Sequence, residues 1–146
     1  YTEAAANYER AIAIAGQDQT LWGNLADALW QMPGRREEAI GMYRRAISLA
    51  QRELESNPAD GLLLAQLGYY HGRTGDAERS RDYLEQAAAA QPDGYVVYYF
   101  TVAAADRGDL EEARRTAAEA VRLGYPESLL RVDPSLERLT AARPAG

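Results

Sequence analysis

The chain has 146 residues, of which 47% are hydrophobic and 26% are charged, and it contains no cysteine. This length is typical of one domain, the lack of cysteine excludes a disulfide framework or thiolate metal site, and no apolar run approaches the roughly 18 residues of a membrane span. The formal net charge of -6 argues against nucleic acid as a partner, because phosphate neutralisation supplies most non-specific affinity.

Small and large apolar residues recur in a fixed order, which indicates an internal repeat. The order occurs as Trp22, Leu25, Ala26, Gly34, Ala39, Tyr43 and Ala46, as Leu64, Leu67, Gly68, Gly75, Ser80, Leu84 and Ala87, and as Val97, Phe100, Thr101, Gly108, Ala113, Ala117 and Ala120. Its second half alone opens the chain at Ala4, Tyr8 and Ala11. We therefore expect one repeat domain over 1–146, with three complete units and part of a fourth.

Residues 1–16 are predicted to form the second helix of a truncated unit, and residues 17–57 the first complete unit. Apolar residues at helical spacing predict two amphipathic helices in that unit, with Pro33-Gly34 between them. Asp18 precedes the first helix and is expected to cap its free backbone N–H groups. The seven-residue insertion Gln51 to Asn57 adds about two turns, so we expect a longer second helix whose apolar face keeps its direction.

Residues 58–91 and 92–124 are predicted to repeat this helix, turn, helix organisation. Asp60 and Asp93 stand where they can cap first helices, and Asp109, with Glu112 three residues later, is expected to cap the last second helix. Small residues indicate where the paired helices touch: Ala26, Gly68 and Thr101 on first helices, and Ala39, Ser80 and Ala113 on second helices.

After Leu123 the repeat stops, and residues 125–146 are predicted to form a capping segment and tail. Two short helical stretches are expected, the second with Asp133 as its cap and Pro134 in its first turn. The side chains expected to cover the last hairpin are Leu129, Leu130, Val132, Leu136 and Leu139. The tail from Arg143 to Gly146 is expected to fray.

These units resemble the tetratricopeptide repeat family, whose pattern is a bulky residue, Leu-Gly, a turn Gly, an Ala, an aromatic, an Ala and a Pro. One unit carries it as Leu64, Leu67-Gly68, Gly75, Ser80, Leu84, Ala87 and Pro92. The chain departs from the pattern at Ser80, Thr101 and Ala117. The resemblance implies an all-α fold, a right-handed superhelical solenoid of antiparallel hairpins with a C-terminal cap, and a function in binding other proteins.

Four turn sequences resemble, more narrowly, repeat regions attached to bacterial signalling proteins, including protein kinases of eukaryotic type and transcriptional regulators. They are Pro33 to Ala39, Asn57-Pro58, Gly124-Tyr125-Pro126 and Asp133-Pro134. This resemblance implies a catalytic or DNA-binding domain upstream of Tyr1. The lack of cysteine and of a visible secretory leader favours the cytoplasm.

In the tetratricopeptide repeat family, the first helices line a concave surface and leave side chains free for a ligand. The resemblance implies a peptide-binding groove of Asn24, Asp27, Trp30, Gln31, Gln66, Tyr69, Arg73, Tyr95, Tyr98, Tyr99 and Val102. Tyr, Trp and Arg dominate binding energy at interfaces, although the tyrosines can equally fill the core. The carboxylate clamp of some members is absent, since Gly23, Asp27, Ala65, Tyr69, Leu62 and Gln66 stand in its places, so we expect an aromatic, hydrogen-bonding groove.

No set of residues in the sequence supports catalysis, a metal ion or a cofactor. His71 is the single histidine and has no convergent partner nearby in sequence, so a structural role is expected. The glycines from Gly68 to Gly75 lack the Lys-Ser or Lys-Thr of a phosphate loop. The pairs Glu37-Glu38 and Glu111-Glu112 begin second helices, where acidic side chains favour the helix dipole.

The sequence therefore predicts a module that binds a protein or peptide and catalyses no reaction, with neither nucleic acid nor a membrane as partner. The alternative is a structural assembly element that self-associates through the repeat edge left open at Tyr1. An enzyme is the least favoured interpretation, because it would need a polar pocket with strongly perturbed acids.

Overall fold

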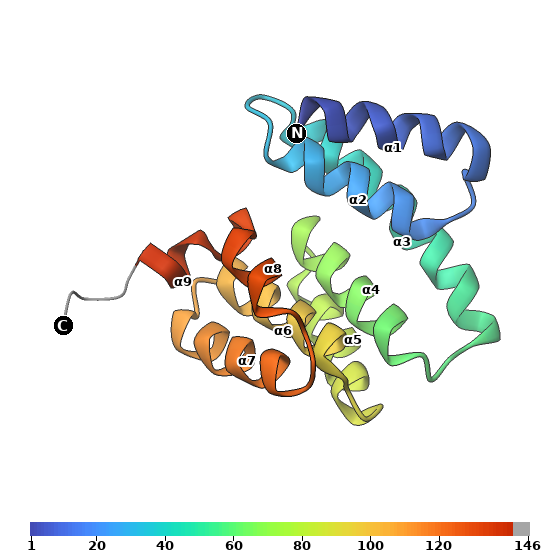
Figure 1. Ribbon diagram of the computed structural model, residues 1–146. Coiled ribbons are helices and arrows are strands. Elements are labelled where there is room, and N and C mark those ends of the chain that lie inside the picture. Colours follow the sequence, from blue (N-terminus) through green and yellow to red (C-terminus); the bar gives the residue numbers. More distant parts are fainter. Residues whose placement is uncertain (142–146) are drawn as a thin grey trace.

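The computed structural model describes residues 1–141, and every regular element in this range is a helix (Figure 1). In chain order they are α1 (Thr2–Ala15), α2 (Gln19–Trp30), α3 (Arg36–Ser56), α4 (Gly61–Arg73), α5 (Ala77–Ala89), α6 (Gly94–Asp106), α7 (Leu110–Arg122), α8 (Glu127–Val132), the 3-10 helix η1 (Pro134–Leu136) and α9 (Glu137–Ala141). The tail expected to fray, Arg143 to Gly146, lies outside the described residues.

The helices form antiparallel pairs, α2 with α3, α4 with α5 and α6 with α7, which stack one after another, and α1 packs on α2. The all-α fold expected from the sequence is confirmed. Small residues lie where the paired helices meet: Ala26, Ala39, Thr101 and Ala113 have no exposed surface. A Cβ at Gly68 would lie 2.7 Å from the side chain of Leu84, so a larger residue there would push α4 away from α5.

Aspartates cap the helices where the sequence predicts them. The side chains of Asp18, Asp60 and Asp93 accept hydrogen bonds from backbone N–H groups in the first turns of α2, α4 and α6. Asp109 accepts one from the N–H of Glu112, but the Glu112 side chain pairs with an arginine instead of returning to the cap. These bonds satisfy N–H groups that have no partner within the helix.

Glycines with positive φ form the turns between paired helices. Gly34, Gly75 and Gly108 have φ of 77, 87 and 80°, and Gly124 ends α7 with φ of 100°. This left-handed region costs a glycine little and strains other residues, which explains the glycine in each turn.

The insertion lengthens α3 as expected, to 21 residues against 13 in α5 and α7. Leu54 on the added turns packs against both clusters of core residues. The extension therefore adds contact with the next hairpin. Of the helices in the preceding hairpin, α4 contacts mainly α3, whereas α6 contacts mainly α4 and only lightly α5.

The C-terminal segment, residues 125–141, covers the last hairpin with fewer side chains than expected. Leu130 and Leu136 are buried, but Leu129 is 48% exposed and Val132 is 75% exposed, so the prediction that these two cover the hairpin is wrong. Leu129 and Val132 are three residues apart and share one face of α8, whereas Leu130 points about 100° away from Leu129, so the helix buries Leu130 and leaves the other two exposed. Instead, η1 contacts α6 and α9 contacts α7.

Candidate functional site

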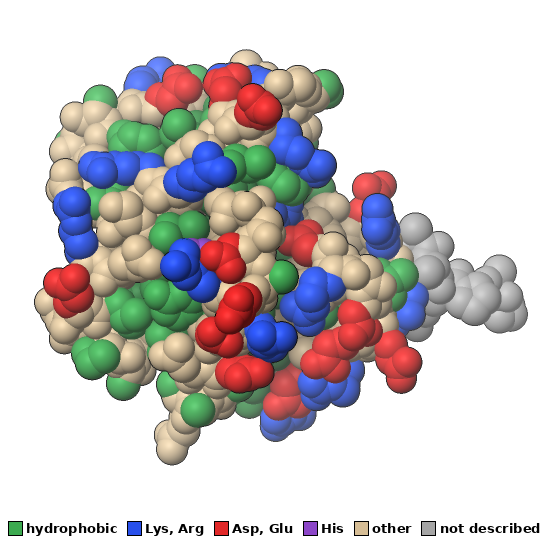
Figure 2. All heavy atoms as spheres, turned by 180° about the vertical axis from the view of Figure 1, so that it is seen from behind, with side chains coloured by type: hydrophobic (Ala, Val, Ile, Leu, Met, Phe, Trp, Pro, Cys, Tyr) green, Lys and Arg blue, Asp and Glu red, His purple; other side chains and the backbone are tan. Residues whose placement is uncertain are grey.

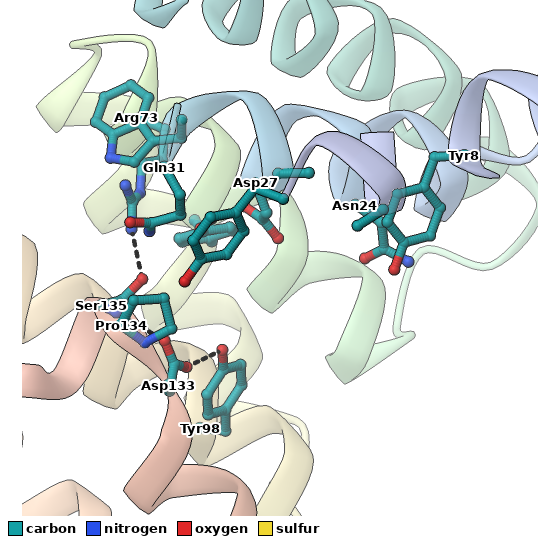
Figure 3. Close-up of a pocket in the computed structure, with 14 residues that line it drawn as sticks. Tyr8, Asn24, Asp27, Gln31, Arg73, Tyr98, Asp133, Pro134 and Ser135 are labelled. Atoms are coloured by element: carbon teal, nitrogen blue, oxygen red, sulfur yellow. Dashed lines mark hydrogen bonds between the residues drawn. The ribbon is translucent and has the colours of Figure 1, made fainter. Parts of the chain in front are cut away.

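A cavity of about 280 Å³ lies between α2 and the C-terminal segment (Figure 3). Several side chains predicted for the groove meet there: Asn24, Asp27, Trp30, Gln31, Tyr69, Arg73 and Tyr98. Two parts of the cavity lining were not predicted from the sequence: Tyr8 on α1 and the turn of Asp133 to Ser135. We call this space the concave cavity.

Asp27 lies at the centre of a hydrogen-bonded group of buried phenols. Its Oδ1 accepts from the hydroxyls of Tyr43 at 2.5 Å and Tyr69 at 2.7 Å, and the two hydroxyl oxygens are 3.3 Å apart. Burial raises the pKa of Asp27, although the two phenol hydrogen bonds favour its ionised form. Tyr43 was expected as a core residue, and its hydroxyl also fixes the carboxylate of the cavity.

Arg73 is buried and is held on several sides. Its Nε lies 2.9 Å from Oδ2 of Asp106, and its Nη2 donates to Oγ of Ser135 at 3.1 Å (Figure 3). The guanidinium carbon also lies 4.5 Å from the ring centre of Trp30 and 5.2 Å from that of Tyr69. The sequence placed Arg73 in the groove, but its charge is already satisfied by the protein itself.

Tyr98 connects α6 to the C-terminal segment. Its hydroxyl donates to Oδ2 of Asp133 at 2.6 Å, and its ring stacks on Tyr125 at 4.7 Å. Burial and the charge of Asp133 raise the pKa of Tyr98. The sequence indicated Asp133 only as a helix cap, a role it also fills through the N–H of Ser135. Nothing in the local pattern shows that this turn returns to the concave face.

The other predicted groove residues lie away from the concave cavity. Gln66 is buried; it accepts from Nε2 of Gln19 at 2.8 Å and donates to the hydroxyl of Tyr99 at 3.4 Å. Burial raises the pKa of Tyr99 to about 12. Tyr95 is half exposed and packs edge-on against Tyr125, and Val102 lies in the core. Gln66 and Tyr99 thus connect α2, α4 and α6 through buried polar groups.

His71 lies inside the fold and is not among the residues that line the concave cavity. Its ring stacks on Tyr83 at 5.4 Å, its Nδ1 is 3.7 Å from Asp76, and its buried Nε2 has no hydrogen-bond partner. Burial lowers its pKa. Within residues 1–141, no group of three or more His, Asp or Glu side chains is placed to hold a metal ion.

A larger groove of about 830 Å³ runs between α5, α6 and α7, with Leu84, Val97 and Phe100 in its lining. We call it the outer groove, and Tyr69 lines both it and the concave cavity. Seen from behind, the molecule shows interspersed acidic and basic side chains without a patch of one sign (Figure 2). No helix in the described part of the chain combines the length and apolar character needed to cross a bilayer.

Comparison with known proteins identifies a repeat. Residues 17–93, more than half of the chain, match the family model described as tetratricopeptide repeat. No curated protein matches the sequence closely enough to count as a relative.

Proposed function

The chain belongs to the tetratricopeptide repeat family, and on that premise we propose that it binds a segment of a partner protein on its concave face. Repeats of this family are generally protein–protein interaction modules and are typically non-catalytic. One observation carries the proposal. In the concave cavity, polar and aromatic side chains from separate helices converge on one space, which is characteristic of a binding site.

The proposed mechanism is binding to a wall that is already ordered. Asp27 and Arg73 are held by the contacts described above, so a ligand need not order them on binding. Asn24, Trp30 and Tyr98 are partly exposed at the cavity and are the proposed contacts, and Tyr95 extends the surface along α6. In this proposal, the more deeply buried Gln66, Tyr69 and Tyr99 do not contact the ligand but hold the contact residues in position.

Selection of peptides from a random displayed library against the intact protein tests the proposal. Asn24→Trp would fill the concave cavity, so the selected peptides should lose at least about tenfold in affinity. Ser128→Trp, on the exposed surface of α8, is the matched control and should leave affinity unchanged. If every selected peptide binds Asn24→Trp as well as the wild type, the concave face is not the binding surface.

A second proposal, self-association, is favoured by a specific observation on α1. Ile14, near the end of α1, is 90% exposed. Contact with a second copy would bury this apolar side chain. In this proposal, the outer side of α1 packs against the same helix of a second copy.

The cellular setting is also a proposal. The turn sequences at Pro33 to Ala39 and Gly124 to Pro126 support a larger bacterial signalling or regulatory protein in the cytoplasm as the parent of this module. The reading frame upstream of Tyr1 tests this. A kinase or DNA-binding domain there would support the setting, and a secretory leader joined directly to the repeats would contradict it.

A further inference from the structure

The chemistry of the concave cavity indicates what kind of side chain it would take. Three charged side chains line it: Asp27, Arg73 and Asp133. Arg73 is paired with Asp106 and also contacts Ser135 and two aromatic rings, although its charge still acts to lower the pKa of Asp27. The remaining charges are two carboxylates on opposite walls of one space (Figure 3).

Both carboxylates retain acceptor capacity. Asp27 uses Oδ1 for both phenols, and no hydrogen bond to its Oδ2 forms within residues 1–141. Asp133 accepts one bond at each oxygen, from the N–H of Ser135 and the hydroxyl of Tyr98, and an ionised carboxylate has about four acceptor sites. Burial raises the pKa of Asp27, and the charge of Asp133 raises it further, so a cation between them would relieve an existing electrostatic cost.

The walls and the size of the cavity fit one long side chain. Tyr98 provides aromatic surface beside Asp133, Tyr8 provides it beside Asn24, and Asn24 and Gln31 provide amide groups. A volume of about 280 Å³ is near the lower limit of small-ligand pockets, so it suits one side chain rather than a folded ligand. A planar guanidinium is weakly hydrated, donates to carboxylates and stacks on aromatic rings, whereas an ammonium is strongly hydrated.

We propose that the concave cavity accepts an arginine side chain of the partner segment, with its guanidinium between Asp27 and Asp133. This inference rests on the proposed function and adds the class of residue that is recognised. The carboxylates from α2 and the C-terminal segment select the charge, and Tyr98 orients the guanidinium plane. The C-terminal segment is therefore part of the binding site as well as a cover for the last hairpin.

The test uses N-acetyl-arginine amide and its neutral analogue of the same shape, N-acetyl-citrulline amide. Titrations are followed in proton–nitrogen correlation spectra at the indole N–H of Trp30, with the indole of Trp22, bonded to the carbonyl of Gly16, as an internal control. The arginine probe should give saturable shifts at Trp30 and bind at least about tenfold more tightly than the citrulline probe. Equal affinity of the two probes, or no saturable shift with arginine, would overturn the inference.

Variants on two separate elements locate the effect. Asp27→Asn and Asp133→Asn each keep an acceptor oxygen and should weaken the arginine probe by about tenfold, while the citrulline probe changes little. Asp82→Asn removes a carboxylate from the exposed surface of α5, outside the cavity, and is the matched control. Wild-type affinity in both cavity variants would show that the carboxylates do not hold the guanidinium.

The peptide selection separates this inference from the proposed function. Selected peptides that are blocked by Asn24→Trp but lack arginine and bind Asp27→Asn normally would refute the arginine site and leave the groove intact. Peptides that Asn24→Trp does not block would refute the groove itself. Peptides enriched in arginine that lose affinity for both Asp27→Asn and Asn24→Trp would support both.

Discussion

At the scale of the residue, the carboxylate of Asp27 determines much of the chemistry of the concave face. It accepts from two phenols, and burial raises its pKa, so ionisation of this group costs the folded state free energy. The Asp27 carboxylate therefore has hydrogen-bond donors, but these do not fully offset the cost of burying its negative charge. The two properties can be separated by substitution.

Asp27→Asn should be at least as stable as the wild type at neutral pH, because it keeps an acceptor and removes the buried charge. Asp27→Ala should lose about 1–3 kcal/mol, because the hydroxyls of Tyr43 and Tyr69 lose their acceptor. The folded pKa lies above the unfolded value of 3.8, so the wild type should gain stability relative to Asp27→Asn as pH falls from neutrality towards 4. Urea unfolding across this pH range measures the difference in the free energy of unfolding. If the wild type became less stable relative to Asp27→Asn on acidification, the raised pKa of Asp27 would be contradicted.

His71 predicts a pH dependence of the opposite sign. Burial lowers its pKa from 6.5, so the unfolded chain binds the proton more readily, and stability should fall as pH drops through this value. His71→Phe keeps a ring to pack on Tyr83 without the titrating group. Between about pH 7.5 and 5.5, the wild type should lose up to about 1 kcal/mol more than His71→Phe in urea unfolding. Parallel curves for the two proteins would show that His71 does not contribute.

At the scale of the element, close backbone approach fixes how α6 joins α7. A Cβ at Gly94 would lie 2.5 Å from the backbone nitrogen of Tyr125 and 2.7 Å from the carbonyl oxygen of Ala120. Backbone atoms cannot yield as a flexible side chain can. The first residue of α6 is therefore restricted to glycine by its neighbour.

Gly94→Ala should destabilise the protein by about 1–3 kcal/mol through this overlap. Gly41→Ala, inside α3 with no atom within 4 Å of the added Cβ, should gain roughly 0.5–1 kcal/mol from helix propensity. Thermal unfolding of the pair provides the measurement. A neutral Gly94→Ala would mean that the start of α6 moves away from α7 without cost.

The C-terminal segment gives a second matched pair. Leu136 is 2% exposed, so Leu136→Ala should cost about 2–5 kcal/mol if the segment is docked as described. Val132 is 75% exposed, and Val132→Ala should change stability by no more than about 0.5 kcal/mol. Chemical denaturation of both variants tests the docking, and similar small losses in both would show that the segment is loosely held.

The helices and their turns could be predicted from the sequence because they depend on local rules. Asp93 before α6 and Gly108 after it follow from capping and from positive φ, which a short stretch of chain reveals. The concave cavity was only partly predictable. The family resemblance implied a place there for Asn24 and Asp27, but Asp133 reaches the cavity through the path of the C-terminal segment, which tertiary packing determines. Helical phase also could not show that Arg73 pairs with Asp106.

At the scale of the whole molecule, the concave face and the exposed side of α1 offer different kinds of contact. The first presents polar and aromatic groups around a cavity, and the second presents Ile14 without a partner in the described chain. In these two proposals, peptide binding and self-association use separate surfaces. A substitution on one surface can therefore abolish one interaction without affecting the other.

Light scattering across a range of protein concentrations distinguishes the two proposals. If α1 mediates self-association, the apparent mass should rise with concentration, and Ile14→Arg should restore a constant value by placing a charge in the apolar contact. Thr2→Arg, at the start of the same helix, controls for the added charge. A constant mass for the wild type would exclude self-association in this range and leave peptide binding untouched.

One ring relates the two hollows of the molecule. Tyr69 lines the concave cavity on one side and the outer groove on the other, and its hydroxyl is fastened to Asp27. Tyr69 is therefore a shared lining residue of the two hollows. A substitution at Tyr69 is expected to alter the lining of both hollows at once.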